Sequence, residues 1–323
     1  MIVVTGGAGF IGSVLLWKLN ENGIDNIIVV DNLGKSSKWN NLVKRRYVDY
    51  INKDRFLSLI LKDALPFKVS AIVHLGACSS TTEGNADFLM ENNFHYSQEV
   101  CKYALSKGIR FINASSAATY GDGKLGFSDK VENIYKLKPL NMYGYSKQLF
   151  DLWLLREKLQ DNVISLKFFN VFGPNEYHKG DMQSVIAKAY AQIHKKGHLS
   201  LFKSTEENLS DGEQKRDFVY VKDCASIMFW LLENPSITGI HNVGTGFART
   251  FNDLAKILFS ALDMKMIIDY FDMPKEMVGR YQNYTCADMD WLKNISCPVA
   301  FSSLEDSVTD YIHNYLSNDD KYI

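Results

Sequence analysis

The stretch Met1-Ile-Val-Val-Thr-Gly6-Gly-Ala-Gly-Phe-Ile-Gly12 decides the fold of this chain. Its first five residues predict a short apolar strand, which runs directly into glycines at positions 6, 9 and 12. Glycines at this spacing allow a tight turn, close approach of the backbone to a pyrophosphate, and close packing of the next helix on the sheet. The stretch therefore predicts a dinucleotide-binding loop that leads into a helix from Phe10 to about Asn22.

A second apolar run supports this interpretation. The run Asn26-Ile-Ile-Val-Val30 predicts another strand, and it is followed directly by Asp31. A carboxylate at this distance from the glycines can hydrogen-bond the adenosine ribose, while the amino end of the intervening helix favours the phosphates. Strand, loop, helix, strand and acid in this order indicate a nucleotide site.

Strand-like runs continue to alternate with helical patterns along the chain, at 71–75, 111–115, 163–169 and 239–243. This alternation predicts an α/β fold with a Rossmann-type doubly wound parallel sheet. We expect a dinucleotide-binding Rossmann domain at 1–169 and 214–245, and a smaller substrate-binding lobe at 170–213 and 246–323. The lobe is expected to contain helices near 250–262, 287–294 and 303–316, a strand near 266–271, and a polar loop at 205–214.

Composition excludes several classes of function. The chain has 323 residues and a formal net charge of −1, so it lacks the charge excess that binds nucleic acid or anionic membranes. Its apolar runs are shorter than the roughly 20 residues that cross a bilayer. The five cysteines show no CxxC pair, and no metal-binding pattern stands out. We therefore expect a cytoplasmic protein without nucleic acid, membrane or metal partners.

The segment Asn141-Met-Tyr-Gly-Tyr-Ser-Lys147 predicts the proton-transfer groups. Tyr143 and Lys147 are four residues apart, so they share one face of a helix. A free phenol titrates near pH 10, and a neighbouring ammonium is expected to make it more acidic. Ser116 follows a predicted strand, at the edge of the sheet where ligands bind, and its hydroxyl could contact the same substrate oxygen as Tyr143.

These residues resemble the extended short-chain dehydrogenase/reductase superfamily and, within it, the family of bacterial ADP-L-glycero-D-manno-heptose 6-epimerases. The resemblance covers nearly the whole chain and rests on Gly76-Ala-Cys-Ser-Ser-Thr-Thr82, Ala114-Ser-Ser-Ala-Ala-Thr-Tyr-Gly121, the segment 141–147, His178-Lys-Gly180, Lys215-Arg-Asp-Phe-Val-Tyr220 and Gly279-Arg-Tyr-Gln282. It implies an isomerase of lipopolysaccharide core heptose synthesis that assembles as a homopentamer.

The resemblance also implies roles for individual residues. It assigns Lys179 to a second acid/base group and Ser116 to binding of a substrate hydroxyl. The implied cofactor contacts are Gly6, Gly9, Phe10, Ile11, Gly12, Asp31, Asn32, Lys38, Lys53, Leu75, Gly76, Ala77, Cys78, Ser79, Asn92, Lys147 and Val171. The implied substrate contacts are Asn170, Asp181, Lys188, Phe202, Lys203, Ser204, Arg216 and Tyr281. The chain departs from the family at Leu75, Asp181 and Lys188, and in a longer loop between Ser204 and Arg216.

The implied reaction is epimerisation of ADP-heptose at C6″ by transient oxidation. Another nucleotide-sugar epimerase, of the 4-epimerase type, remains an alternative, because the Ser-Tyr-Lys set does not dictate which carbon is oxidised. A 4,6-dehydratase would need an acid pair where this chain has Ala117-Ala118. A non-catalytic dinucleotide sensor would have lost Tyr143 and Lys147.

The cofactor prediction rests on opposing charges. Asp31 favours the free 2′-hydroxyl of NAD, whereas Lys38 and Lys53, placed by the resemblance beside the ribose, favour a 2′-phosphate. Asn32 can also donate to a phosphate. Two lysines against one carboxylate predict NADP. For the substrate diphosphate, Arg216 offers a fork that matches phosphate oxygens, and Asp217 is expected to hold that fork.

Overall fold

The computed structural model describes residues 1–274 and 282–323. Its largest element is a seven-stranded sheet in the order β10-β6-β5-β4-β1-β2-β3, in which every strand pair is parallel. The strands are β1 (Ile2–Thr5), β2 (Ile27–Asp31), β3 (Asp49–Asn52), β4 (Ala71–His74), β5 (Arg110–Ser116), β6 (Ile164–Phe168) and β10 (Gly239–Val243). The predicted doubly wound parallel sheet is therefore confirmed.

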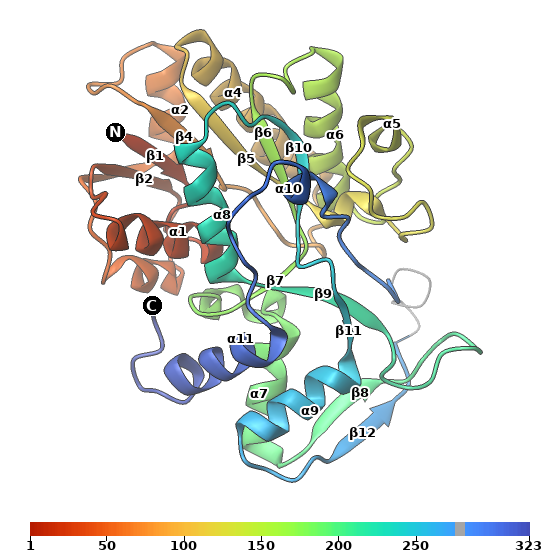
Figure 1. Cartoon of the computed structure of the whole chain (residues 1–323). Coiled ribbons are helices and arrows are strands. Elements are labelled where there is room, and N and C mark those ends of the chain that lie inside the picture. The colour runs from red at the N-terminus through yellow and green to blue at the C-terminus, as the bar shows by residue number, and fades with distance from the viewer. Residues whose placement is uncertain (275–281) are drawn as a thin grey trace.

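Helices cover both faces of this sheet (Figure 1). Apolar side chains of α1 (Phe10–Glu21) and α8 (Val221–Glu233) pack on one face. Side chains of α2 (Lys53–Leu61), α4 (Tyr96–Ser106) and α6 (Met142–Arg156) pack on the other. Strands β1, β2 and β4 are buried along almost their whole length, which explains their apolar runs. Five shorter helical segments lie between β2 and α6 in the chain. They are η1 (Ser37–Leu42), α3 (Ala86–Leu89), η2 (Met90–His95), η3 (Ala117–Tyr120) and α5 (Val131–Ile134).

A smaller lobe lies below the sheet in Figure 1. It contains a three-stranded sheet, β11-β9-β7, and a two-stranded parallel sheet, β12-β8. These strands are β7 (Asn170–Phe172), β8 (Leu199–Phe202), β9 (Lys215–Tyr220), β11 (Ala248–Thr250) and β12 (Ile268–Phe271). Around them pack α7 (Val185–Lys196), α9 (Phe251–Ala261) and α11 (Leu304–Tyr311), which continues into η5 (Ile312–Leu316).

The predicted elements of this lobe are confirmed near 250–262, 266–271 and 303–316, and residues 205–214 form turns. The helix expected at 287–294 is shorter, α10 (Asp290–Asn294). Its Trp291 packs against the large sheet, where the indole N–H donates to the carbonyl of Asn242 at 2.7 Å. The chain thus crosses between sheet and lobe several times, and the division by residue ranges stays a prediction.

The sheet order reverses between β1 and β4, because β2 and β3 lie on one side and β5, β6 and β10 on the other. A crevice opens at such a point beyond the carboxyl ends of the strands, and ligands of open α/β sheets bind there. Within residues 1–274 and 282–323, no helix has the length and apolar character of a membrane span, and no cluster of potential metal ligands occurs.

Candidate active site

The glycine-rich loop joins β1 to α1 and leaves no room for larger side chains. Gly6 has a φ of +67°, and a Cβ there would lie 2.7 Å from the backbone of Gly76. A Cβ on Gly12 would lie 2.2 Å from the carbonyl oxygen of Gly6. The loop therefore packs directly on the segment after β4, and the amino end of α1 faces the crevice.

Two adjoining cavities occupy this crevice. The larger has a volume of about 630 Å³ and the smaller about 280 Å³, and both are lined by Gly6, Asp31 and Lys38. All residues expected to contact the cofactor line one or both cavities: Gly6, Gly9, Phe10, Ile11, Gly12, Asp31, Asn32, Lys38, Lys53, Leu75, Gly76, Ala77, Cys78, Ser79, Asn92, Lys147 and Val171. Gly6 lines both cavities, whereas Gly9 and Gly12 line the larger one, so the glycine-rich loop and the two cavities form a site suited to an elongated dinucleotide.

Charged side chains gather at the smaller cavity. The Asp31 carboxylate accepts hydrogen bonds from the amides of Ala8 at 2.9 Å and Asn32 at 2.7 Å. It also pairs with the Lys38 ammonium at 2.6 Å. Lys53 donates to the Asn92 side chain at 2.9 Å. Lys38 thus offsets the negative charge of Asp31, and Lys53 adds a second cation at this end.

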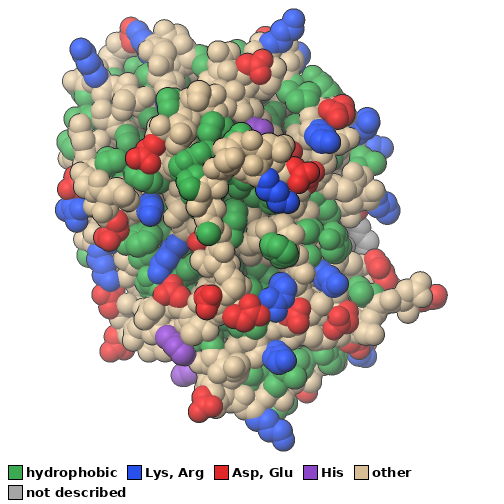
Figure 2. Space-filling view, viewed as in Figure 1, with side chains coloured by type: hydrophobic (Ala, Val, Ile, Leu, Met, Phe, Trp, Pro, Cys, Tyr) green, Lys and Arg blue, Asp and Glu red, His purple; other side chains and the backbone are tan. Residues whose placement is uncertain are grey.

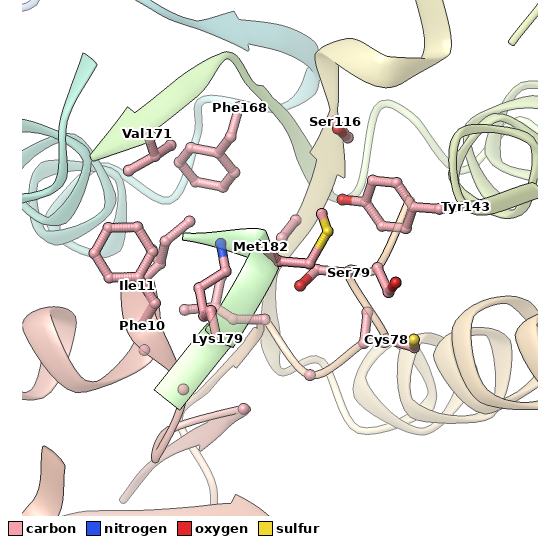
Figure 3. A pocket seen from close by; sticks show the side chains of 18 of the residues that line it. Phe10, Ile11, Cys78, Ser79, Ser116, Tyr143, Phe168, Val171, Lys179 and Met182 are labelled. Carbon is pink, nitrogen blue, oxygen red and sulfur yellow. The ribbon is translucent and has the colours of Figure 1, made fainter. Parts of the chain in front are cut away.

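The Ser-Tyr-Lys set is assembled at the larger cavity. Helix α6 begins at Met142 because the Asn141 side chain caps it, accepting a hydrogen bond from the Gly144 amide at 2.8 Å. Figure 3 shows the Tyr143 phenol and Ser116 side by side, one from α6 and the other from the end of β5. A hydrogen bond with Ser116 lowers the pKa of Tyr143, but burial has the larger effect and raises it above its ordinary value.

Lys147 lies one helical turn from Tyr143, in the same cavity. Its ammonium donates to the Ala114 carbonyl at 2.7 Å and is almost fully buried. Burial lowers the pKa of Lys147 to about 8, against the opposing effect of Asp151. The Tyr143 phenol is therefore less acidic than usual, contrary to the expectation, because burial disfavours its phenolate and the Lys147 ammonium is directed at the Ala114 carbonyl.

Asn93 ties the cofactor loop to the catalytic helix, a role that sequence reasoning missed. It is fully buried in η2, and its amide donates to the Cys78 carbonyl at 2.9 Å and to Ser146 Oγ at 3.0 Å. Its oxygen accepts from the Cys78 amide at 2.8 Å. Ser146 in turn donates to the Tyr143 carbonyl at 2.8 Å. A single asparagine beside Asn92 carries no sequence signal for such a link.

Lys179 enters the larger cavity from the lobe. It lies in η4 (Tyr177–Met182), and Figure 3 shows its amine between Phe10 and Met182. The nitrogen lies 5.3 Å from the centre of the Phe10 ring. Burial lowers the pKa of Lys179, Glu176 opposes this effect, and Lys188 adds to it. A lysine in such surroundings can exchange a proton near neutral pH more readily than a solvated one.

The structure spreads the expected substrate contacts over a wider area. Asn170 lines the larger cavity and donates to Thr285 Oγ1 at 2.9 Å. Six of the other expected substrate contacts do not line this cavity: Asp181, Lys188, Phe202, Lys203, Ser204 and Arg216. The seventh, Tyr281, lies outside the described residues. Arg216 donates to the Lys215 carbonyl at 2.9 Å and stands 5.7 Å from the Phe251 ring.

Asp217 has a different role from the one expected. Side chains of adjacent residues in a strand point to opposite faces, so the Asp217 side chain projects from the face of β9 opposite to that of Arg216. Its carboxylate accepts hydrogen bonds from the amides of Thr245 at 2.8 Å, Gly246 at 3.0 Å and Ala287 at 2.9 Å. The carboxylate therefore fixes the turn after β10 and the segment before α10, and the prediction that it holds the Arg216 fork is wrong.

Comparison with known proteins identifies the family. Residues 2–244 match the NAD dependent epimerase/dehydratase family. The chain belongs to this family. Among its curated relatives, an ADP-L-glycero-D-manno-heptose-6-epimerase of Nitratidesulfovibrio vulgaris is 59% identical, with 100% of both chains covered. An enzyme of the same name from Fusobacterium nucleatum is 47% identical, again over 100% of both chains. This member of the epimerase/dehydratase family is thus an enzyme of the isomerase class with a nicotinamide cofactor.

Solved structures support the same assignment. The ADP-L-glycero-D-manno-heptose-6-epimerase of Helicobacter pylori superimposes with a TM-score of 0.80 at 28% identity, covering 97% of this chain and 95% of the other. A UDP-N-acetylglucosamine 4-epimerase from Methanobrevibacter ruminantium gives a TM-score of 0.81 at 27% identity, covering 98% of each chain. The family's architecture therefore serves epimerases that act on different carbons.

Proposed function

We propose that this enzyme interconverts the two C6″ epimers of ADP-glycero-manno-heptose by transient oxidation. The observation that carries the proposal is that Ser116, Tyr143, Lys147 and Lys179 line one cavity together with the glycine-rich loop. Relatives at up to 59% identity over their whole length bear the name of this epimerase. When bound, the nicotinamide cofactor supplies a reversible acceptor for the hydride of C6″.

The chain's own residues then handle the protons. The Tyr143 phenol exchanges a proton with the 6″-oxygen in one orientation, and Ser116 beside it binds that oxygen. Hydride return to the opposite face of a planar ketone leaves the new hydroxyl pointing another way, which a phenol fixed on a helix cannot easily serve. Lys179 approaches from the lobe, and its half-buried amine supplies the second acid/base group.

We further propose that Arg216 binds the substrate diphosphate, with Asn170, Asp181, Lys188, Phe202, Lys203, Ser204 and Tyr281 as other substrate contacts. Arg216 lies on β9, which pairs with the strand that carries Asn170. A guanidinium can form two parallel hydrogen bonds to phosphate oxygens.

For the cofactor, we propose NADP. The charge of Lys38 offsets that of Asp31, so Lys53 gives the lining of the smaller cavity a net positive charge, which suits a 2′-phosphate. Mass spectrometry of the cofactor released from the denatured protein tests this, and detection of NAD alone would reject it. Lys38→Ala should weaken binding of NADP more than of NAD.

We also propose that the enzyme acts in the cytoplasm, in synthesis of the lipopolysaccharide core heptose, and as a homopentamer. The size of the assembly can be measured by analytical ultracentrifugation.

A 4-epimerase that acts on another nucleotide sugar is the alternative, and the fold match to such an enzyme keeps it open. Incubation of the purified protein with ADP-D-glycero-D-manno-heptose, followed by chromatographic separation of the 6″-epimers, distinguishes the two. Formation of the L-glycero epimer is expected. Its absence, together with turnover of a UDP-sugar, would support the alternative.

A further inference from the structure

Asn41 connects the glycine-rich loop to the loop that carries Lys179. It lies in η1, and only 2% of it is exposed. Its amide nitrogen donates to the Ala8 carbonyl at 2.9 Å and to the Asn175 carbonyl at 3.1 Å, and lies 3.3 Å from His178 Nδ1. One side chain thus contacts the cofactor loop on one side and the turn 175–178 on the other.

The turn 175–178 has a backbone that depends on its surroundings. Asn175 is fully buried and has a φ of 75°, which is uncommon outside glycine. Its side chain donates to Ser13 Oγ at 2.9 Å and accepts from the Ile323 amide at 3.1 Å. A residue in such a conformation persists only where neighbouring contacts hold it. The hydrogen bond from Asn41 is one of these contacts.

The conformation of the turn 175–178 also determines where Lys179 points. The Lys179 amide donates to the Glu176 carbonyl at 3.0 Å, and its ammonium lies over the Phe10 ring at the start of α1. On the lobe side, the Glu176 carboxylate accepts from Ser184 Oγ at 2.7 Å and from the Tyr311 hydroxyl at 3.1 Å. These contacts attach the loop to the lobe, whereas Asn41 attaches it to the cofactor side.

The same contacts reach the predicted ribose site. The Ala8 amide donates to Asp31, and Asp31 pairs with Lys38, which belongs to η1 together with Asn41. The segment η1 therefore touches the adenosine end of the crevice and the Lys179 loop at once.

We propose that Asn41 is a positioning residue, which holds the Lys179 loop in register with the glycine-rich loop and so aligns the Lys179 amine with the cavity. This inference rests on the proposed role of Lys179 as the second acid/base group.

The first experiment measures the environment of Lys179 directly. The rate at which acetic anhydride acetylates Lys179 is followed against pH by peptide mass spectrometry, in wild type and in Asn41→Ala. Burial holds the pKa of Lys179 below its ordinary value, so the wild-type midpoint should be low. In Asn41→Ala, water should enter around a displaced loop and move the midpoint upward. An unchanged midpoint would overturn the proposal.

Asn20→Ala is the matched control. Asn20 is 4% exposed in the same half of the molecule, and its amide likewise donates to two backbone carbonyls, those of Ile24 at 3.2 Å and Arg46 at 2.8 Å. It should lower stability to a similar degree and leave the Lys179 midpoint in place. Asn41→Ser, which keeps a small polar group, serves the same comparison if Asn41→Ala does not fold.

The second experiment follows single-turnover reduction of the bound cofactor by each purified epimer. Asn41→Ala should slow reduction by the epimer that depends on Lys179 by on the order of 10- to 100-fold, because small displacements of a reacting group have effects of this size. Reduction by the other epimer should change little. Equal losses with both epimers would overturn the proposal. Wild-type activity of Lys179→Met would instead refute the proposed mechanism, and the acetylation midpoint would still decide whether Asn41 positions Lys179.

Discussion

The two proposed proton-transfer groups are held in the crevice in different ways. Tyr143 occupies the first turn of a 15-residue helix whose cap, Asn141, lies two positions away. Lys179 occupies a six-residue segment that is interrupted at Gly180, and its loop is held by contacts such as the one between Asn41 and His178, 137 positions apart in the chain. Local sequence is enough to build the first arrangement, whereas the second depends on tertiary contacts and should be the more sensitive to distant substitutions.

The sharpest way to separate the two groups is to remove each one. Tyr143→Phe and Lys179→Met should each lower the rate of epimerisation by about 100- to 10,000-fold, which is the usual effect of losing a positioned proton-transfer group. In single-turnover experiments, each variant should lose reduction of the bound cofactor by one of the two epimers, and the epimer affected should differ between the two variants. Near wild-type epimerisation by Lys179→Met would show that Tyr143 alone serves both orientations.

The surroundings of Tyr143 can be probed through the buried amine of Lys147, one helical turn away on α6. Its pKa of about 8 in the folded protein lies below the ordinary 10.5. Between these values the unfolded chain still binds the proton that the folded protein has released, so stability rises with pH. The free energy of unfolding of wild type, relative to Lys147→Met, should increase by up to about 3 kcal/mol across this window. Chemical denaturation at both ends of the window measures it, and a constant difference would contradict the prediction.

The Lys179 side can be probed through its backbone. Gly180 has a φ of 53° and a ψ of −124°, and a Cβ there would meet no atom within 4 Å. Gly180→Ala therefore introduces backbone strain without a clash, and should lower kcat by on the order of 10- to 100-fold through displacement of Lys179. Gly197→Ala, at φ 76° and equally open, is the control and should retain wild-type kcat. Equal kcat values in the two variants would show that the loop tolerates movement.

The smallest effect is expected on substrate affinity at the lobe. Arg216→Lys keeps the positive charge and loses the planar fork, so one hydrogen bond to the diphosphate should be lost. We expect KM for ADP-heptose to rise by about tenfold, with the amount of bound cofactor unchanged. Steady-state kinetics and mass spectrometry of the released cofactor test both points. An unchanged KM would assign Arg216 to the structure of β9 instead.

Sequence reasoning succeeded where chemistry is local. The residues at the carboxyl ends of β1, β2, β4 and β5 meet at one edge of a parallel sheet whatever the details of packing, so the glycine loop, Asp31 and Ser116 could be placed together in advance. The spacing of Tyr143 and Lys147 on α6 follows from helix periodicity alone.

Sequence by itself thus determined the sheet, the cofactor crevice and the Ser-Tyr-Lys set, because strand order and helix period translate directly into position. Only the tertiary structure decided the balance of charges and the links between distant segments. Burial raised the pKa of Tyr143 above its ordinary value, and Asn41 and Asn93 joined loops that are far apart in the chain. Desolvation and long-range hydrogen bonds depend on which surfaces pack together, and a linear pattern of residues contains no local signal for either.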